Sequence, residues 1–351
     1  MIHDDLVIID ASTVLAGPSV GTYFAELGAK VIKIEHPEHP DVTRSWKLPT
    51  EEGDSSISAY FASINYKKEY LSLDLKSDKD HAQFIELIST ADILITNFKK
   101  GDDIKLNITD DDLLNVNSRL IIGKINGYGS ESDRVAYDLI LQAETGFMSM
   151  NGTPDSGPVK MPVALIDVLS AHHLKEALLL ALYERTRTNK GQAISVSLYD
   201  AAISSLVNQA SNYLMGNHIP ERMGSLHPNI APYGEIFLTA DQAQITFAIG
   251  SNTHFKKLCK TLNLPELITD SRFENNQDRV INRKKLSDII QKAVGKLDSI
   301  ILLSELRLKN VPAGKIKNLK EVFDDEIARQ LIREEIIDGK NTKRITSVVS
   351  K

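Results

Sequence analysis

The stretch LVIIDASTVLAGPSVGTYFAELGAKVIKIE, residues 6–35, decides the fold. Residues 6–10 form a short apolar run rich in β-branched side chains, and residues 30–35 form another, so both predict strands. Residues 22–27 between them have helical character, and Gly28 suits the position just after a helix. A strand, a helix and a second strand in this order predict a parallel sheet with helices on its faces.

The same alternation continues toward the middle of the chain. We expect further strands at residues 70–75, 91–97 and 120–127, and a last one at the start of QAISVSLYDAAISSL. Helices are expected at residues 78–89, 137–148 and 168–186. The pattern predicts an α/β fold with a large, Rossmann-like parallel-sheet domain over residues 1–205.

The pattern changes after about Asn217. The run GEIFLTADQAQITFAIG alternates in polarity on both sides of Ala240 and Asp241 and predicts a β-hairpin. Helices are expected at residues 254–262 and 282–295. We therefore expect a linker at residues 206–221, a smaller α/β domain at residues 222–320 and a return linker at residues 321–351.

The composition limits the classes of protein to which the chain can belong. Of its 351 residues, 42% are hydrophobic and 25% are charged, which is the balance of a globular protein. A net charge of -6 argues against a sequence-independent nucleic-acid binder. The apolar run at residues 178–182 is too short to span a membrane, and residues 1–9 do not resemble a signal peptide.

The cysteine and histidine residues point to no disulfide and no metal. Cys259 stands alone, so we expect a reducing, cytoplasmic environment. His36 and His39 share a proline-rich turn, and the adjacent His172 and His173 point about 100° apart on a helix. Because this is not the spacing of metal ligands, we expect no metal site.

Several motifs follow one another in an order typical of one family. They are LVIIDASTVLAGP with LGAKVIKIEHPEHPDVTRSW, then NYKKEYLSLDLKS, ADILITNFKKG, GQAISVSLYDA, MGSLHPNIAPYGEIFLTADQAQITFAIGS and VPAGKIKNLKEVFDDE. Together they resemble the class III CoA-transferase family, also called the CaiB/BaiF family, whose relatives include formyl-CoA transferase and alpha-methylacyl-CoA racemase. The resemblance covers nearly the whole chain.

The resemblance implies a fold and an assembly as well as an activity. It implies two domains, the larger binding coenzyme A, and a homodimer in which two chains are linked like rings. It also implies a C-terminal segment that returns to the large domain beyond Lys351, where this sequence stops, so we expect that tail to be absent. The implied partners are small molecules, an acyl-CoA and a carboxylic acid, with no nucleic acid and no membrane.

Asp167, in PVALIDVLSAHHLKEA, matches the family's catalytic aspartate. A carboxylate can attack a thioester, so the resemblance implies acyl-CoA:carboxylate CoA transfer through a covalent mixed anhydride and an aspartyl-CoA thioester. From the residues alone, Asp167 is equally an N-cap ahead of the expected helix, and the two roles are compatible. In either role the helix dipole is expected to help keep it ionised.

Coenzyme A needs cations for its phosphates and apolar surface for its adenine and its pantetheine arm. Positions that match family contacts supply both kinds of side chain. The predicted coenzyme A contacts are Leu15, Arg44, Leu73, Lys76, Asn97, Phe98 and Lys105. Taken one at a time, each cation is equally a solvated surface charge, and Phe98 is equally a core residue.

Tyr137 and Gln142 stand where the family builds the acyl pocket, and Tyr137 is predicted to be a second catalytic residue. A packed amphipathic residue is the alternative for Tyr137. Leu15 and Val135 stand where the formyl-CoA transferases have Gln and Lys. Both differences make the pocket less polar and favour an acid other than oxalate or formate.

Three other functions stay open. A racemase of the same fold needs an acid/base pair and has His where this chain has Tyr137. A non-catalytic coenzyme A-binding protein is the second alternative. A nucleotide-binding oxidoreductase is the third, but Gly17 and Gly21 do not complete a G-x-G-x-x-G motif.

Overall fold

The chain is divided into two compact units in a computed structural model that describes residues 5–349. The larger unit comprises Met1–Met150, Pro158–Pro220 and Gln330–Lys351, and the smaller unit comprises Asn151–Gly157 and Glu221–Arg329. Residues 1–4 and 350–351 lie outside the description.

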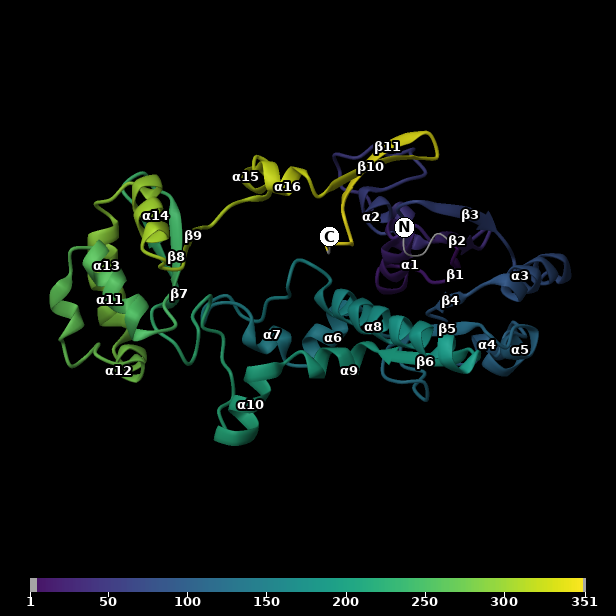
Figure 1. The fold of residues 1–351 in the computed structure, drawn as a ribbon, viewed down its shortest axis with the longest axis horizontal. Coiled ribbons are helices and arrows are strands. Elements are labelled where there is room, and N and C mark those ends of the chain that lie inside the picture. The colour runs from purple at the N-terminus through teal and green to yellow at the C-terminus, as the bar shows by residue number, and fades with distance from the viewer. Residues whose placement is uncertain (1–4, 350–351) are drawn as a thin grey trace. The chain divides into compact units, whose positions relative to one another are not determined.

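A six-stranded parallel sheet forms the centre of the larger unit (Figure 1). Its strands are β1 (Val7–Asp10), β2 (Lys30–Glu35), β3 (Lys68–Ser72), β4 (Ile93–Thr96), β5 (Ile121–Asn126) and β6 (Gln192–Ser197). Their order is β3-β2-β1-β4-β5-β6, which confirms the predicted Rossmann-like sheet. The order reverses between β1 and β4, and ligands of such sheets bind outside the carboxyl ends of the strands at this point.

Helices cover both faces of this sheet. On one face, α1 (Ala16–Glu26) and α8 (Leu165–Thr188) pack Phe24 and Leu174 against Ile8 of the sheet. On the other face, α3 (Asp78–Thr90) and α5 (Asp110–Val116) pack Phe84 and Leu113 against Ile9. Because Ile8 and Ile9 are neighbours on one strand, they point to opposite faces, as the strand geometry requires.

Two element boundaries differ from the sequence predictions for identifiable reasons. Strand β3 begins at Lys68, two residues early, because this lysine is buried in an ion pair with Asp10 although its type is usually exposed. The single helix expected at residues 137–148 is α6 (Asp138–Glu144) and α7 (Phe147–Met150). Gly146 lies between them with a φ of 88°, a conformation that interrupts a helix.

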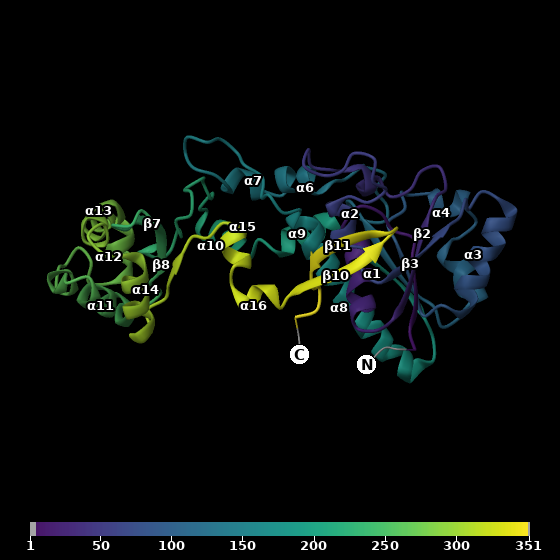
Figure 2. The same ribbon diagram turned by 90° about the horizontal axis from the view of Figure 1, so that it is seen from above.

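Other short elements complete the larger unit. They are η1 (Val42–Ser45), α2 (Ala59–Ser63), α4 (Asp102–Lys105), α9 (Leu198–Ser204), α10 (Val207–Gly216), β10 (Ile332–Ile337) and β11 (Lys340–Ile345). Helix α10 lies within the expected linker at residues 206–221. The expected return linker ends in an antiparallel hairpin, β10–β11, which packs beside α2 (Figure 2).

The smaller unit contains the predicted β-hairpin. Strands β7 (Tyr233–Leu238), β8 (Gln244–Ala248) and β9 (Ala313–Lys315) form an antiparallel sheet. Its helices are η2 (Pro265–Ile268), α11 (Asn252–Thr261), α12 (Asn276–Ile281), α13 (Arg283–Val294), α14 (Ser299–Leu308), α15 (Leu319–Phe323) and α16 (Glu326–Arg329). Phe237 and Phe247 of the sheet pack with Phe255 of α11 in a core of their own.

Two kinds of feature, a membrane-spanning helix and a cluster of metal ligands, are absent from the described part of the chain. Within residues 5–349, no helix is both long enough and apolar enough to cross a membrane. The same residues hold no group of three or more His, Cys, Asp or Glu side chains placed to bind a metal ion.

Candidate active site

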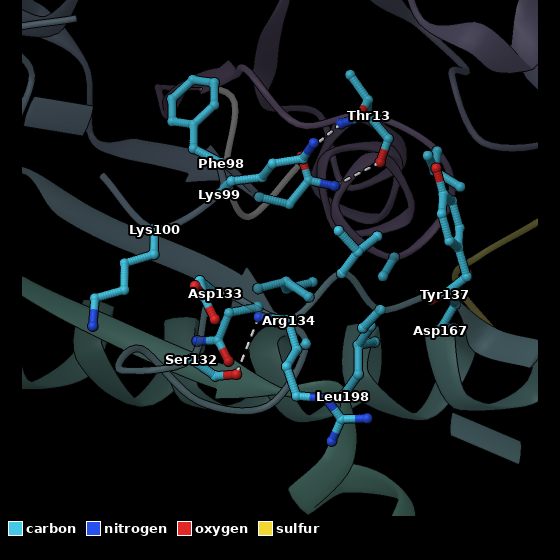
Figure 3. A pocket seen from close by; sticks show the side chains of 18 of the residues that line it. Thr13, Phe98, Lys99, Lys100, Ser132, Asp133, Arg134, Tyr137, Asp167 and Leu198 are labelled. Carbon is cyan, nitrogen blue, oxygen red and sulfur yellow. Dashed lines mark hydrogen bonds between the residues drawn. The ribbon is translucent and has the colours of Figure 1, made fainter. Parts of the chain in front are cut away.

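A cavity of about 190 Å³ opens at the carboxyl ends of β1, β4 and β5, where the strand order reverses. It brings together five of the residues predicted from the sequence, namely Asp167, Tyr137, Leu15, Asn97 and Phe98. In Figure 3, Tyr137 and Asp167 lie at one side of the cavity and Phe98 lies across from them. Its position is the one at which sheets of this topology bind ligands.

Asp167 is the third residue of α8 and not the N-cap that its residue type also allows. The helix begins at Leu165 after Ala164, so it starts three residues earlier than predicted. Its first turn is capped from another element, because the Ile166 N–H donates to Asp138 Oδ1 at 2.8 Å. The carboxyl group of Asp167 is thereby left free for another role.

The Asp167 carboxyl group is buried without a partner. The residue is 8% exposed, and among residues 5–349 its side chain forms no hydrogen bond that would stabilise the charged form. Burial, together with the nearby charge of Asp138, raises the pKa of Asp167 to about 7. A helix N-terminus contributes only about 0.3–1 kcal/mol at a typical site, whereas a rise of this size corresponds to about 4 kcal/mol. Burial therefore outweighs the help toward ionisation that the start of α8 is expected to give Asp167.

Asp138 and Gln142 hold the start of α8 in place. The Gln142 side-chain amide donates to Asp138 Oδ2 at 2.6 Å, and its carbonyl accepts the Met161 N–H at 2.8 Å. Gln142 is 1% exposed, so it acts as a buried bridge between α6 and the segment before α8. Tyr137, the residue just before α6, is 53% exposed and lines the cavity.

Tyr60 is a neighbour of Asp167 that the sequence did not indicate. It lies on α2, and its ring meets Trp46 edge to face at 5.1 Å. Burial, with the charges of Asp167 and Asp138 next in weight, raises the pKa of Tyr60 to about 12. The phenol therefore keeps its proton at neutral pH.

Arg44 lies outside the cavity, and its donors are largely in use. Its guanidinium forms a bidentate pair with Glu35, the shortest contact being 2.6 Å, and reaches Asp338 at 3.3 Å. It also stacks over the Phe61 ring at 3.9 Å. To bind a phosphate, this arginine must give up part of these contacts.

The other predicted coenzyme A contacts lie apart from the cavity. Leu73 is a core residue with 2% exposure, and Lys76 is exposed in the turn that follows β3. Lys105 is exposed on α4 and pairs with Asp102 at 2.9 Å. Their contact with coenzyme A stays a prediction.

The structure adds three cations to the cavity wall, Lys99, Lys100 and Arg134, that the sequence did not single out. Lys100 pairs with Glu131 at 3.3 Å, and Arg134 pairs with Glu144 at 2.8 Å. A second cavity of about 590 Å³ shares Lys99 and Lys100 with the first. The cations make this region suited to an anionic ligand.

Comparisons with known proteins identify the family of the chain. The sequence model of the family described as CoA-transferase family III matches residues 4–349. Succinate--glutarate CoA-transferase of Agrobacterium fabrum is 36% identical over 324 residues, which cover 91% of this chain and 80% of that protein. Human succinyl-CoA:glutarate CoA-transferase is 32% identical over 319 residues, covering 90% of this chain and 72% of that protein.

The similarity to a solved structure points to the same family. A CaiB/BaiF family protein from Brucella suis superposes with a TM-score of 0.84 at 34% sequence identity. The match covers 99% of this chain and 91% of that chain. The chain therefore belongs to CoA-transferase family III.

Proposed function

We propose that this protein transfers coenzyme A from an acyl-CoA to a free carboxylic acid through a covalent intermediate on Asp167. One observation carries the proposal: a carboxyl group that is 8% exposed, without a hydrogen-bond partner, faces a cavity in a chain of this family. Burying such a group without a partner is costly, and groups of this kind concentrate at reactive sites.

The proposed reaction needs only the two substrates and the Asp167 carboxylate. The carboxylate attacks the thioester carbonyl of the donor, the carbon–sulfur bond breaks, and coenzyme A leaves as the thiolate. The thiolate attacks the aspartyl carbonyl of the resulting anhydride, which releases the donor acid and forms an aspartyl-CoA thioester. The acceptor carboxylate attacks that thioester and displaces the thiolate. The thiolate then attacks the acceptor carbonyl, which forms the new acyl-CoA and regenerates Asp167.

We infer that the donor is succinyl-CoA and that the acceptor is another dicarboxylic acid. Relatives named for succinyl-CoA and glutarate or mesaconate support this choice. The cations of Lys99, Lys100 and Arg134 could hold the remote carboxylate of either acid by charge-assisted hydrogen bonds.

The assembly and the binding contacts belong to the same proposal. Leu15 and Phe98 would contact the part of coenzyme A that leads to the thioester, because they share the cavity with Asp167. Lys76 and Lys105 would attract its phosphates as exposed cations. We retain the intertwined homodimer and the cytoplasmic location as predictions.

The racemase alternative is weaker on the geometry. Removing an α-proton needs a base that accepts it and an acid that returns it. The wall of the 190 Å³ cavity contains Tyr137 and Asp167 but no histidine. As the described residues form it, the wall therefore lacks the imidazole with which the racemase motif would supply a base.

The proposal is tested by trapping the intermediate. The protein is incubated with succinyl-CoA and glutarate, quenched with hydroxylamine, and its peptides are analysed by mass spectrometry. We expect a hydroxamate on Asp167, and a loss of turnover of at least about 10³-fold in Asp167→Asn, because the step depends on this nucleophile. Asp133→Asn, at an exposed acid of the same cavity, is the matched control for the change of charge. Transfer that survives in Asp167→Asn, or α-proton exchange without transfer, would contradict the proposal.

A further inference from the structure

The loop between β1 and α1 forms the cavity wall that faces Asp167. Thr13, Val14 and Leu15 from this loop line the cavity with Asp167. Val14 has a φ of 72°, in the left-handed region that a β-branched residue rarely adopts. Such a conformation is strained and persists only where the surroundings enforce it.

Asn97 enforces this conformation from the neighbouring strand. Its side-chain carbonyl accepts the Thr13 N–H at 3.0 Å, and its side-chain amide donates to the Thr13 carbonyl at 2.8 Å. These are the dashed bonds drawn at Thr13 in Figure 3. Thr13 follows β1 and Asn97 follows β4, so the amide joins the two strands at the point where their order reverses.

A buried ion pair holds the loop from the opposite side. Lys33 and Asp41 pair at 3.2 Å, and both side chains are fully buried. The Asp41 carboxylate accepts the Val14 N–H at 3.2 Å, and the Lys33 ammonium donates to the Ser12 carbonyl at 2.7 Å. Each charge therefore contacts its partner and the loop at once.

A second buried ion pair also binds the loop between β1 and α1. Asp10 and Lys68 are fully buried and pair at 2.7 Å, and Asp10 also accepts the Ser12 N–H at 3.1 Å. Side chains thus bind every backbone polar group of the loop from the Ser12 N–H to the Val14 N–H.

Stability alone does not account for this construction. Replacing a buried ion pair with apolar residues is often neutral or stabilising, so such a pair is a weak device for holding a fold together. It is better suited to fixing one conformation among several. Here the conformation so fixed is strained, and it lines the same cavity as the group that we propose to react.

We propose that Asn97, Lys33 and Asp41 are positioning residues that clamp the loop 12–14 and so set the place of the cavity wall opposite Asp167. The proposal rests on the proposed function, in which Asp167 attacks a thioester in this cavity. It gives Asn97 a role different from the coenzyme A contact implied by the family resemblance. A displacement of about 1 Å in an attack geometry can cost about 10²-fold in rate.

The variant Asn97→Ala separates the two roles of this residue. It removes both bonds to Thr13 from a half-buried position and leaves the buried pairs intact. We expect kcat to fall about 10²-fold, while the dissociation constant of coenzyme A, measured by calorimetry, stays within about twofold of the wild-type value. Asn117→Ala removes two bonds from another side-chain amide, to the Ile88 and Ala91 carbonyls away from the cavity, and is the control that should leave both kcat and coenzyme A binding unchanged. Weakened binding with an unchanged kcat in Asn97→Ala would overturn the positioning role.

The buried pair gives an independent test. Lys33→Met with Asp41→Asn removes both charges together, so that no charge is left buried without a partner. We expect kcat to fall here too, and adding Val14→Gly should restore part of it, because glycine holds a positive φ without strain. An unchanged kcat in the folded double variant, or no recovery with glycine, would contradict the proposal.

A matched buried pair controls for a general loss of stability. Arg185 of α8 pairs with Asp92 at 2.8 Å in the same unit. Asp92 lies just before β4 begins, so this pair is at the end of the sheet opposite the cavity. Arg185→Met with Asp92→Asn should lower the melting temperature and keep the kcat of the folded protein. If the Lys33 and Asp41 variant does not fold, Asn97→Ala decides the outcome.

Failure of this proposal is distinguishable from failure of the proposed function. If hydroxylamine traps no adduct on Asp167 in the wild-type protein, the proposed function fails, and the positioning role fails with it. If the adduct forms and Asn97→Ala keeps the wild-type kcat, the positioning role alone is wrong.

Discussion

Replacing Asp167 with asparagine should stabilise the folded protein above pH 7. The pKa of Asp167 rises from 3.8 to about 7 because the carboxyl group is buried beside Asp138. Each pH unit of such a rise corresponds to about 1.4 kcal/mol, so ionising Asp167 in the folded state costs about 4 kcal/mol. Asparagine keeps the shape and carries no charge, and the carboxylate that it replaces has no hydrogen bond to lose among the described residues.

The pH dependence of this gain follows from linkage. Between pH 3.8 and 7 the folded state binds more protons than the unfolded state, so the stability of the wild-type protein falls as the pH rises through this window. The advantage of Asp167→Asn should therefore be nearly full at pH 8 and shrink to roughly two-fifths at pH 5.

Denaturant unfolding followed by the fluorescence of Trp46 measures this advantage. Trp46 is the single tryptophan and lies in the same unit as Asp167. Asp133→Asn, at an exposed acid of the same cavity, is the control and should follow the wild-type curve. An Asp167→Asn variant no more stable than the wild-type protein at pH 8, or one stabilised equally at both pH values, would refute the account of Asp167 as a buried, destabilised carboxylate.

Three further experiments have defined expected outcomes. The pH profile of kcat/KM should rise with an apparent pKa of about 7, because Asp167 reacts only when ionised; a rise centred near pH 4 would contradict this. Gly191→Ala should lower the melting temperature, because a Cβ there collides with the Leu120 carbonyl, whereas Gly53→Ala, with open space around it, should leave the melting temperature unchanged. Arg344→Met should destabilise the protein by about 3–5 kcal/mol in denaturant unfolding, since it leaves the buried Glu26 carboxylate of α1 without its cation; a change below about 1 kcal/mol would contradict that role.

The sheet and its ligand-binding edge could be predicted from residues 6–35 and the strands that follow. Parallel strands buried on both faces appear as short apolar runs, and the helices between them have their own periodicity. The first two residues of strand β3 were not predicted because Lys68 is charged. Only the fold shows that Asp10 neutralises this charge. The hairpin β10–β11 was not predicted because its exposed, charged strands lack an alternation of apolar and polar residues.

The site itself was only partly predictable. Asp167 was found through its motif, but its raised pKa comes from burial and from Asp138, which lies on another helix. Tyr60 is in no motif that we identified, and the fold alone brings it near Asp167. The motif that contains Arg44 could not reveal that Glu35 and Asp338 already occupy its donors. Such facts depend on contacts between residues distant in the sequence.

The fate of the acceptor's oxygen tests the central claim most directly. The protein, in excess over succinyl-CoA so that only a single turnover takes place, is given glutarate whose carboxylates carry oxygen-18, and the peptide that contains Asp167 is then analysed by mass spectrometry. Attack by the acceptor on an aspartyl thioester leaves one acceptor oxygen on the aspartate when the anhydride is cleaved. The account predicts one heavy oxygen in the Asp167 carboxyl group. Turnover that leaves this peptide unlabelled would mean that the acids exchange coenzyme A without a covalent bond to Asp167, and the account would be wrong.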